Sequence, residues 1–391
     1  MELKKYKLGE ILELQRGYDL PSSLMKKGGV LVAGSNGVIG YHNEARSNHP
    51  CITVGRSGSV GKVHYYEQAT WAHNTALFVK DFKGNNPKYL YYFLKNLHLD
   101  KIFDKGSSVV PSLDRKVVHS LNISFHKDVD IQTRIATVLS NIDRKITLNR
   151  AINQNLEAMA KQLYDYWFVQ FDFPDENRRP YKSSGGKMVW NDKLKREIPE
   201  GWDDGILIDI ANITMGQSPD GSSYNEVGEG MLFYQGSTDF GMRFPSVRQY
   251  TTAPSRFAKK GDILMSVRAP VGSINIANND CCIGRGLSAI NSKLGSISHL
   301  YYILNDLRIA FDQRNAAGTT FGSITKEDLY SLPIIIPSDE VIRAFDKICS
   351  PMFDRQMILG EEIDNLIKQR DELLPLLMNG QVSVNSDLSA H

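Results

Sequence analysis

Two long helical segments constrain the fold of this chain more than any other feature of its sequence. Residues 130–168 contain neither glycine nor proline. Such a helix is roughly 57 Å long, because each residue adds about 1.5 Å. That length is too great for one small domain to cover its apolar side. Steps of alternately four and three residues define a heptad seam with Lys145 and Asn149 as polar positions; its apolar members are Ile131, Ile135, Val138, Ile142, Ile152, Leu156, Met159, Leu163 and Tyr166.

A second segment near the end of the chain supplies a helix of equal length. Its seam lies about 211 residues after the first and consists of Ile342, Phe345, Cys349, Met352, Gln356, Leu359, Ile363, Leu366, Arg370, Leu373 and Leu377. Two matching seams favour a helical pair over two unrelated core helices. Pro351 and Gly360 lie inside this segment, so we expect a kink or an interruption that leaves two pieces, residues 339–349 and 352–378.

The sequence that precedes each helix is duplicated. YLYYFLKNL (89–97) parallels HLYYILNDL (299–307), and GSSVVPSLDRKVVHSLNI (106–123) parallels GTTFGSITKEDLYSLPI (318–334). GDILMSVRAPVGSINIA (261–277) parallels HPCITVGRSGSVGKVHY, which brings Arg268 near Arg56 and Gly272 opposite Gly61. Short strand-like runs separated by glycine-rich turns predict a mixed α and β domain in each copy. The chain is therefore a tandem repeat of domain plus helix.

These observations predict an α+β fold with an internal pseudo-two-fold repeat. Two similar globular domains would be separated by two long coiled-coil helices, antiparallel because the first helix leads to the second domain and the second helix can return. The expected divisions are 1–127 (head one), 128–170 (first helix), 171–202 (a surface connector rich in proline, glycine, serine and charge), 203–337 (head two), 338–380 (second helix) and 381–391 (a mobile tail).

Composition and motifs argue against an enzyme or a membrane protein. No apolar run approaches the ~20 residues of a membrane span, and the N-terminus lacks the apolar core of a signal peptide, so we expect a cytoplasmic protein. None of the four cysteines forms a CxxC pair, and we expect no metal site and no cofactor in this chain. The common nucleotide-binding, hydrolase and metalloprotease motifs are missing. Seven of the nine histidines lie in head one, so no catalytic histidine recurs in both copies.

Two similar heads joined by a stiff spacer suit a ligand with two separated sites, and duplex DNA is the commonest such ligand. Head one carries 18 Lys and Arg against 10 Asp and Glu over residues 1–127, a surplus of eight. That surplus suits contact with phosphates. Residues 210–336 carry 11 against 10, so head two must concentrate its basic groups on one face to bind DNA.

Base reading requires Arg, Asn, Gln or Ser on exposed loops, where their side chains reach base edges. In head one the candidates are Arg16, Tyr18, Ser35, Asn36, Arg56, Ser57, His73 and Asn74, with Ser107 and Ser108 as phosphate contacts. In head two they are Gln217, Ser218, Arg268 and Arg285, with Thr319 and Thr320 as phosphate contacts. Arg243 and Arg248 are candidates for the basic face of head two. The alternative is that these glycine-rich turns only close hairpins and that the arginines are solvated surface groups.

Nearly the whole chain resembles the specificity subunit of a type I restriction–modification system. The resemblance rests on KLGEILEL, SNGVIGYHNEA, GDILMSVRAPVGSINIA, GTTFGSIT followed by LPI, REIPEGW, and the two helices with LEAMAKQLYDYWFV and IDNLIKQRDELLPLLMNGQV. The ordered, duplicated set is far more specific than any single piece.

The resemblance implies a non-catalytic DNA-binding subunit. Each head would be a target recognition domain for one half of an asymmetric, split DNA sequence, and the helices would set the gap and dock two modification subunits. Those partners would use S-adenosylmethionine, and two restriction subunits would use ATP with Mg²⁺. Open alternatives are a coiled-coil scaffold whose heads bind proteins or glycans, a nuclease with an unrecognised site, and an inactive or recombining cassette of the same family.

Overall fold

The computed structural model describes residues 3–47, 49–103, 112–316 and 322–384. The chain divides into two compact units: unit 1 comprises Met1–Thr147 and Asp364–His391, and unit 2 comprises Leu148–Ile363. Both divisions fall inside the long helices α5 (Val129–Tyr164) and α9 (Asp339–Met378). Each helix therefore contributes one part to each unit.

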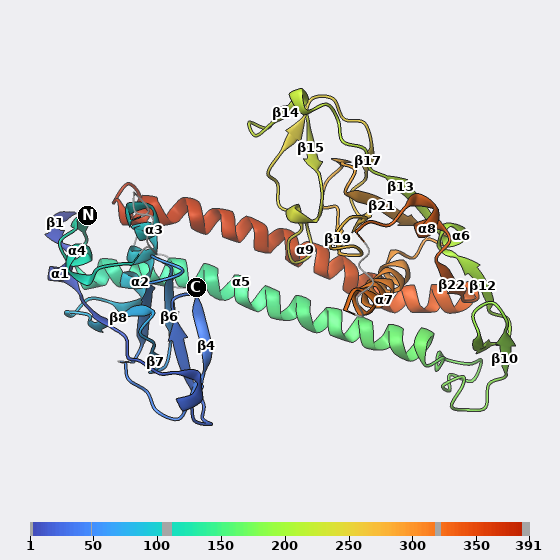
Figure 1. Cartoon of the computed structure of the whole chain (residues 1–391), viewed down its shortest axis with the longest axis horizontal. Helices are drawn as coiled ribbons and strands as arrows, with labels where there is room; N and C mark the ends of the chain where they lie inside the picture. Colours follow the sequence, from blue (N-terminus) through green and yellow to red (C-terminus); the bar gives the residue numbers. More distant parts are fainter. Residues whose placement is uncertain (1–2, 48, 104–111, 317–321, 385–391) are drawn as a thin grey trace. The chain divides into compact units, whose positions relative to one another are not determined.

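Unit 1 contains head one (Figure 1). Its elements before α5 are β1 (Lys4–Lys7), α1 (Leu8–Ile11), β2 (Glu13–Arg16), the 3-10 turn η1 (Ser22–Leu24), β3 (Val30–Gly34), β4 (Gly37–His42), β5 (Cys51–Gly55), β6 (Val63–Tyr66), β7 (Trp71–Ala72), β8 (Ala76–Asp81), α2 (Pro87–Asn96), α3 (Leu99–Phe103), α4 (Arg115–His119) and β9 (Asn122–Phe125). The central sheet has the antiparallel order β2-β8-β5-β6. A second sheet has the order β4-β3-β7, with β3 and β7 parallel, and β1 pairs with β9.

Helix α2 illustrates how the sequence of head one specifies its elements. Pro87 occupies the first turn, where its missing N–H costs no hydrogen bond. The side chain of Asn86 accepts a hydrogen bond from the Tyr89 N–H at 3.1 Å and caps the helix. The buried face of α2 contributes Leu90 and Phe93 to the core.

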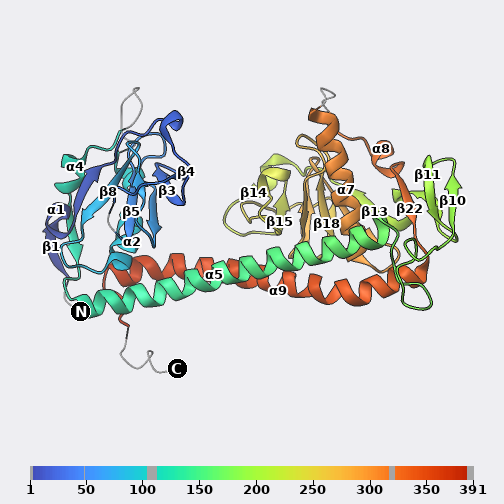
Figure 2. The same ribbon diagram turned by 90° about the horizontal axis from the view of Figure 1, so that it is seen from below.

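The core of unit 1 lies between the central sheet, α2 and the two long helices. Ile135 and Leu139 come from the beginning of α5, whereas Leu374 and Leu377 come from the end of α9. Arg370 of α9 donates to Asp143 of α5 at 2.8 Å. The start of one helix thus lies beside the end of the other within this unit, so the helices are antiparallel here (Figure 2).

Unit 2 contains head two and the segment that leads into it. Its elements after α5 are the π-helical turn η2 (Asp165–Val169), β10 (Met188–Asn191), β11 (Arg196–Pro199), β12 (Asp203–Ile206), α6 (Leu207–Ile210), β13 (Ala211–Met215), η3 (Gly221–Ser223), β14 (Tyr224–Asn225), β15 (Met231–Tyr234), η4 (Ser237–Asp239), β16 (Tyr250–Thr251), β17 (Phe257–Ala258), β18 (Ile263–Ser266), β19 (Ile274–Ile276), β20 (Cys281–Ile283), β21 (Leu287–Ser292), α7 (Ile297–Ala316), α8 (Lys326–Tyr330) and β22 (Pro333–Ile336).

The topology of head two repeats that of head one. The sheet β13-β21-β18-β19 has the connectivity of β2-β8-β5-β6, and β12 pairs with β22 as β1 pairs with β9. The parallel pair of β15 and β20 corresponds to the pair of β3 and β7. These correspondences confirm the predicted α+β fold with an internal repeat. The antiparallel pair of β15 and β16 corresponds to the β3–β4 hairpin but has a longer connection, and β14 and β17 extend this sheet in head two.

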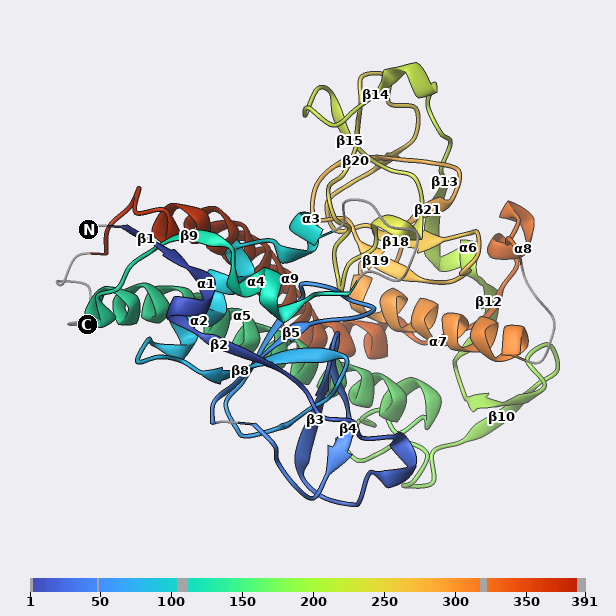
Figure 3. The same cartoon turned by 60° about the vertical axis from the view of Figure 1, so that its left-hand side comes forward.

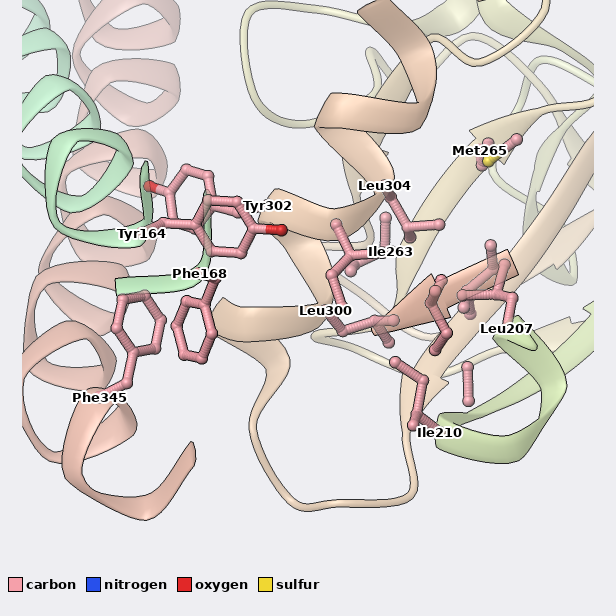
Figure 4. Packing of buried hydrophobic residues seen from close by; sticks show 14 of the residues in the cluster. Tyr164, Phe168, Leu207, Ile210, Ile263, Met265, Leu300, Tyr302, Leu304 and Phe345 are labelled. Carbon is pink, nitrogen blue, oxygen red and sulfur yellow. The ribbon is translucent and has the colours of Figure 1, made fainter. Parts of the chain in front are cut away.

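The core of unit 2 joins head two to its helices. Figure 4 shows Phe168 from η2 beside Phe345 from α9, and Tyr164 from α5 beside Tyr302 from α7. The α7 side chains also contact the sheet residues of β18 through Leu304. Asn149 of α5 donates to Glu362 of α9 at 2.9 Å, so the helices are antiparallel in this unit also.

The seam of α5 departs from the predicted heptad positions. The predicted members Met159 and Tyr166 are 54% and 36% exposed, whereas their neighbours Ala160 and Trp167 are 3% and 4% exposed. The same displacement is present near the start of the helix, because Leu139 and Ile146 are buried in place of the predicted Val138 and Lys145. One of the two seam positions in each heptad is therefore wrong by one residue along the whole helix.

The predicted break in the second helix is also wrong, because α9 is continuous from Asp339 to Met378. Pro351 is exposed, so water can donate a hydrogen bond to the Lys347 carbonyl, which loses its partner because proline has no N–H. Cys349 and Phe353, on either side of the proline, are buried in the core and hold the helix in place. Gly360 has a packing role: a Cβ atom there would lie 2.2 Å from Cε2 of Phe244.

The connector between α5 and head two is ordered rather than a plain surface loop. It contains the β10–β11 hairpin, and Phe171, Phe173 and Trp202 are buried against the end of α5. The domain limits inferred from the sequence stay predictions. The predicted mobile tail (381–391) lies outside the described residues from position 385 onward.

Candidate nucleic-acid interface

The two heads share a close backbone crossing next to the candidate loops. Gly17 N–H donates to the Ala76 carbonyl at 3.0 Å, and Gly216 N–H donates to the Leu287 carbonyl at 2.9 Å. A Cβ atom on Gly17 would lie 2.1 Å from the His73 carbonyl oxygen, and one on Gly216 would lie 2.2 Å from the equivalent oxygen of the second head. Only glycine allows this approach. The crossing places the residues after β2 and β13 at the same point of each fold.

A second shared feature is the loop after the central strand. Gly61 N–H donates to the Gly55 carbonyl at 2.9 Å, and Gly272 N–H donates to the Ser266 carbonyl at 2.8 Å. Both Gly61 and Gly272 have positive φ, 77° and 84°. The backbone bridge of Ser57 with Ser112 matches that of Arg268 with Ser323. Arg268 therefore corresponds to Ser57, the residue next to Arg56, which agrees with the sequence alignment that set it near Arg56.

In head one a carboxylate connects two of the candidate side chains. Arg16 is exposed, and its Nη2 lies 3.7 Å from Oδ1 of Asp19. Asn74 also donates to Asp19 through its side-chain amide. The structure thus brings Arg16 and Asn74 together around a residue that the sequence reasoning missed. The i,i+3 spacing of Arg16 and Asp19 was a signal that could have found it.

The other candidates of head one gather around Thr75. The Ser35 N–H donates to Thr75 Oγ1 at 3.3 Å, and His73 Nδ1 lies 3.0 Å from the same oxygen. Asn36 accepts a hydrogen bond from Lys62 Nζ at 2.8 Å. Ser35 and Asn36 form the turn of the β3–β4 hairpin (Figure 3), so this hairpin lies against the glycine-rich loop. Lys62 and Thr75 were also missed by the sequence reasoning.

Tyr18 takes part in a stacked group. Its ring meets Trp71 edge to face at 6.3 Å between centroids. The guanidinium of Arg46 lies 4.8 Å from the Trp71 centroid and 5.4 Å from that of Tyr18. Tyr18 is half-buried, so its ring supports Arg46, an exposed cation beside the loops that the sequence reasoning also missed. Arg56 and Ser57 are the remaining described candidates of head one, and both are half-buried. The Arg56 N–H donates to the Thr75 carbonyl at 2.8 Å.

In head two the candidates surround a polar depression of about 540 Å³, called here the head-two hollow. It is lined by Glu226, Gln235, Gly236, Ser237, Thr238, Asp239, Arg248, Gln249, Ser266, Arg268, Ala269, Arg285 and Gly286. Arg248, Arg268 and Arg285 are exposed. Gln217 and Ser218 adjoin it, since Ser218 Oγ accepts a hydrogen bond from the Arg285 N–H at 3.3 Å. This near-neutral head therefore concentrates three arginines in one place.

Arg243 does not belong to this surface. Its side chain is 9% exposed, and its Nη1 donates to Glu157 of α5 at 3.2 Å. Its guanidinium lies over the ring of Phe353 at 4.7 Å. The loop turns inward because the next residue, Phe244, is buried against Gly360. We therefore remove Arg243 from the candidate set. The large apolar residue next to it, Phe244, was the sequence signal that this loop turns inward.

Four candidates, Ser107, Ser108, Thr319 and Thr320, lie outside the described residues. For the other candidates contact with DNA stays a prediction.

Burial produces large pKa shifts in the core of unit 2. Burial lowers the pKa of His299 to about 3 and raises that of Cys349 to about 12. Across the described ranges, no group of three or more His, Cys, Asp or Glu side chains is arranged to hold a metal ion. None of the helices in those ranges combines the length and apolar composition that a membrane crossing requires.

Comparison with protein families gives a match over most of the chain. Residues 1–158 and 199–369 match the family described as the type I restriction modification DNA specificity domain. The two matched segments correspond to the two copies of the repeat.

Individual relatives agree with this match. A protein of Methanocaldococcus jannaschii named as a type I restriction enzyme MjaX specificity subunit is 32% identical over 345 residues, which cover 84% of this chain and 76% of that protein. The type I restriction enzyme MjaIX specificity subunit of the same organism is 27% identical over 317 residues, 76% of this chain and 69% of that protein. The crystal structure of a type I restriction–modification system S subunit from M. genitalium has a similar fold, with a TM-score of 0.67, 17% identity and 96% of both chains covered.

Proposed function

This chain belongs to the family of type I restriction–modification DNA specificity domains, and from that premise we propose how its two heads divide the reading of one DNA target. The chain is the non-catalytic specificity subunit of a type I restriction–modification system. Head one reads one half of a split target and head two reads the other half.

The observation that carries this proposal is a shared backbone with unlike side chains. Both heads build the crossing at Gly17 and Gly216. The loops beside it carry Arg16, Asp19 and Asn74 in head one, but Asp239 and Arg248 in head two. Side chains at base edges determine which sequence is bound, whereas the backbone only positions them. Two heads with matched frames and different loops therefore read two different half-sites, and the whole target is asymmetric.

Proteins of this family bind DNA and assemble with other subunits of their systems. For this chain we propose two modification subunits and two restriction subunits as partners. The modification subunits would carry S-adenosylmethionine, and the restriction subunits would carry ATP with Mg²⁺. The chain itself would bind none of these cofactors and would act on cellular DNA in the cytoplasm.

Methylation mapping tests the proposal directly. The chain is co-expressed with its modification subunit in a host that lacks DNA methylation, and modified bases are located by sequencing. We expect adenine methylation at a single split motif, which gives both half-sites at once. A stable, purified complex that methylates no split motif would contradict the proposal and favour a scaffold whose heads bind other ligands.

A change of helix length tests the role of α5 and α9 as a spacer. Both helices pass from one unit to the other, so we expect one heptad inserted into each to lengthen the gap and leave both half-sites unchanged. The measurement is the same methylation map. An unchanged gap in an active complex would exclude the spacer role.

A further inference from the structure

The arginines of the head-two hollow differ in how firmly they are held. Arg248 Nε donates to Oδ1 of Asp239 at 2.7 Å, and Nη2 donates to the same oxygen. Nη2 also lies 3.4 Å from Thr238 Oγ1. Within the described part of the chain, the side chains of Arg268 and Arg285 donate to no carboxylate. Of the three arginines, only Arg248 is therefore held by a carboxylate on the Nε side of its guanidinium.

Asp239 is itself fixed, and it is almost completely buried. Its side chain is 6% exposed, whereas that of Arg248 is 62% exposed. The second oxygen, Oδ2, accepts a hydrogen bond from the Gln235 N–H at 3.1 Å. The Asp239 carbonyl accepts from the Ser246 N–H at 2.6 Å, which holds the segment leading to Arg248. In this pair Asp239 is therefore held rigidly, whereas the guanidinium of Arg248 is open to solvent.

The geometry leaves one particular edge of Arg248 for a ligand. Nε and Nη2 point at Asp239, and no described residue accepts a hydrogen bond from Nη1. The outer end of the guanidinium thus carries Nη1, which has no acceptor among the described residues, and Nη2, whose contact with Thr238 Oγ1 is long at 3.4 Å. Two parallel donors of this kind match the O6 and N7 acceptors of guanine in the major groove.

The carboxylate argues for a base rather than a phosphate as the ligand. A phosphate contact depends on the positive charge of its partner, and an adjacent carboxylate cancels that charge and repels phosphates. A base contact depends on the direction in which the guanidinium donors point, and the buried carboxylate of Asp239 fixes that direction. We propose that Arg248 reads a guanine in the half-site of head two, and that Asp239 is the positioning residue that aims it. Arg268 and Arg285, free of such a partner, serve phosphates.

This inference rests on the proposed function, and modified DNA tests it separately. Once mapping has given the target, the purified complex of the chain with its modification subunits is bound to duplexes in which each guanine of the head-two half-site is replaced in turn by 7-deazaguanine. That base lacks N7. We expect one position where the replacement weakens wild-type binding roughly tenfold or more.

The variant Arg248→Lys connects that position to the residue. Lysine keeps the charge but cannot make the paired contact, so we expect it to weaken binding to the unmodified target and to be insensitive to 7-deazaguanine at that position. The half-site of head one stays selective and serves as an internal control. If the variant binds like wild type, or is as sensitive as wild type at every guanine, Arg248 does not read guanine.

Asp239→Asn tests the positioning role. We expect it to lose discrimination at the same guanine, and the double variant Asp239→Asn with Arg248→Lys to be no weaker than Arg248→Lys alone, because the carboxylate acts through the arginine. Additive losses would overturn this role.

A matched control lies in the connector of the same unit. Arg179 donates to Asp175 through Nε and Nη2 at 3.1 and 3.0 Å, and its side chain is 60% exposed. Arg179→Lys and Asp175→Asn alter an equivalent pair away from the hollow, and we expect neither to change base selectivity. Failure of the proposed function itself would show earlier, as a wild-type complex that methylates no split motif.

Discussion

Head one and head two build the same backbone crossing and then present different groups around it. In head one, Asp19 and Thr75 link candidate side chains that come from several loops, and the head has a large basic surplus. In head two, the arginines gather in one hollow above the buried Asp239. The duplicated frame is kept where the main chain makes close contacts, and it diverges where only side chains meet solvent.

The heads also differ in how they attach to their helices. In unit 1 Tyr92 donates to Asp143 at 2.6 Å, and Arg370 donates to the same carboxylate. In unit 2 the loop of Arg243 reaches α5 at Glu157, and Gln356 of α9 donates to that carboxylate at 2.9 Å. Each head is therefore attached to the long helices by its own polar contacts. A substitution in the contacts of one head should change the stability of that head alone.

We expect the largest effect from substitutions that disrupt the backbone crossing shared by the two heads. Gly17→Ala and Gly216→Ala each place a Cβ atom within 2.2 Å of a carbonyl oxygen, and the main chain there cannot move aside easily. We expect each to destabilise its own unit by about 3 kcal/mol or more. Hydrogen exchange should show lost protection in unit 1 for the first variant and in unit 2 for the second.

Matched controls for the crossing exist in both heads. A Cβ atom on Gly29 or on Gly221 would meet nothing within 4 Å, so Gly29→Ala and Gly221→Ala should leave exchange unchanged. Equal protection in the crossing variants and these controls would show that the crossing is not a rigid feature of the fold.

A smaller effect separates anchoring from DNA contact in head two. Arg243→Gln removes the ion pair with Glu157 and the contact with Phe353. We expect about 2 kcal/mol of lost stability, because Arg243 is buried while Glu157 is partly solvated. Urea unfolding of unit 2, followed by its exchange-protected amides, measures the loss.

The comparison variant is Arg268→Gln, whose side chain is exposed. It should keep full stability and instead reduce the salt dependence of DNA binding by about one counterion. If the Arg243 variant instead keeps full stability and shows a reduced salt dependence of DNA binding, Arg243 belongs to the DNA-binding residues.

We expect the smallest effect, a change in the pH dependence of stability, at a position where the two heads carry different residues. His299 of head two aligns with Tyr89 of head one. Burial lowers the pKa of His299 to about 3 from 6.5, so the folded state resists protonation. Its contribution is complete above pH 6.5 and is lost as the pH falls toward 3, by about 1.4 kcal/mol at pH 5.5. Burial raises the pKa of Tyr89, so that residue does not titrate in this range.

His299→Gln isolates this contribution, since the other histidines titrate equally in both proteins. The free energy of unfolding of unit 2 should fall less between pH 7 and 5.5 in the variant than in wild type, by about 1.3 kcal/mol. Parallel pH profiles for the two proteins would mean that His299 is not the titrating group.

Local patterns in the sequence predicted the elements, and long-range packing decided their details. The α9 seam from Ile342 to Ile363 is buried as predicted apart from the half-buried Met352, because this periodicity lies in the sequence itself. In α5 one seam position per heptad lies one residue later than predicted, as at Ile146 and Trp167. The apolar pattern permits either order of three- and four-residue steps, and packing decides between them. Pro351 did not break α9, because its exposure and the buried Cys349 and Phe353 depend on the surrounding fold.

The candidate interface divides in the same way. Most candidates, including Arg16, Asn74 and Arg248, lie on exposed or half-buried loops near the shared crossing, and residue type with glycine-rich context was enough to select them. Arg243 was misassigned because its exposure depends on Glu157, 86 residues away in the chain. No sequence pattern around Asp239 indicates that it fixes Arg248, because that contact requires the turn at η4 to bring them together.

The sequence by itself determined the duplication, the two long helices and the family, since each is encoded as a repeat or a period along the chain. Only the tertiary structure decided which charged side chains face solvent and which are anchored in the core. The physical reason is that an arginine lowers its free energy equally well beside a buried carboxylate or in water. The choice between these depends on neighbours that the chain brings together only when it folds.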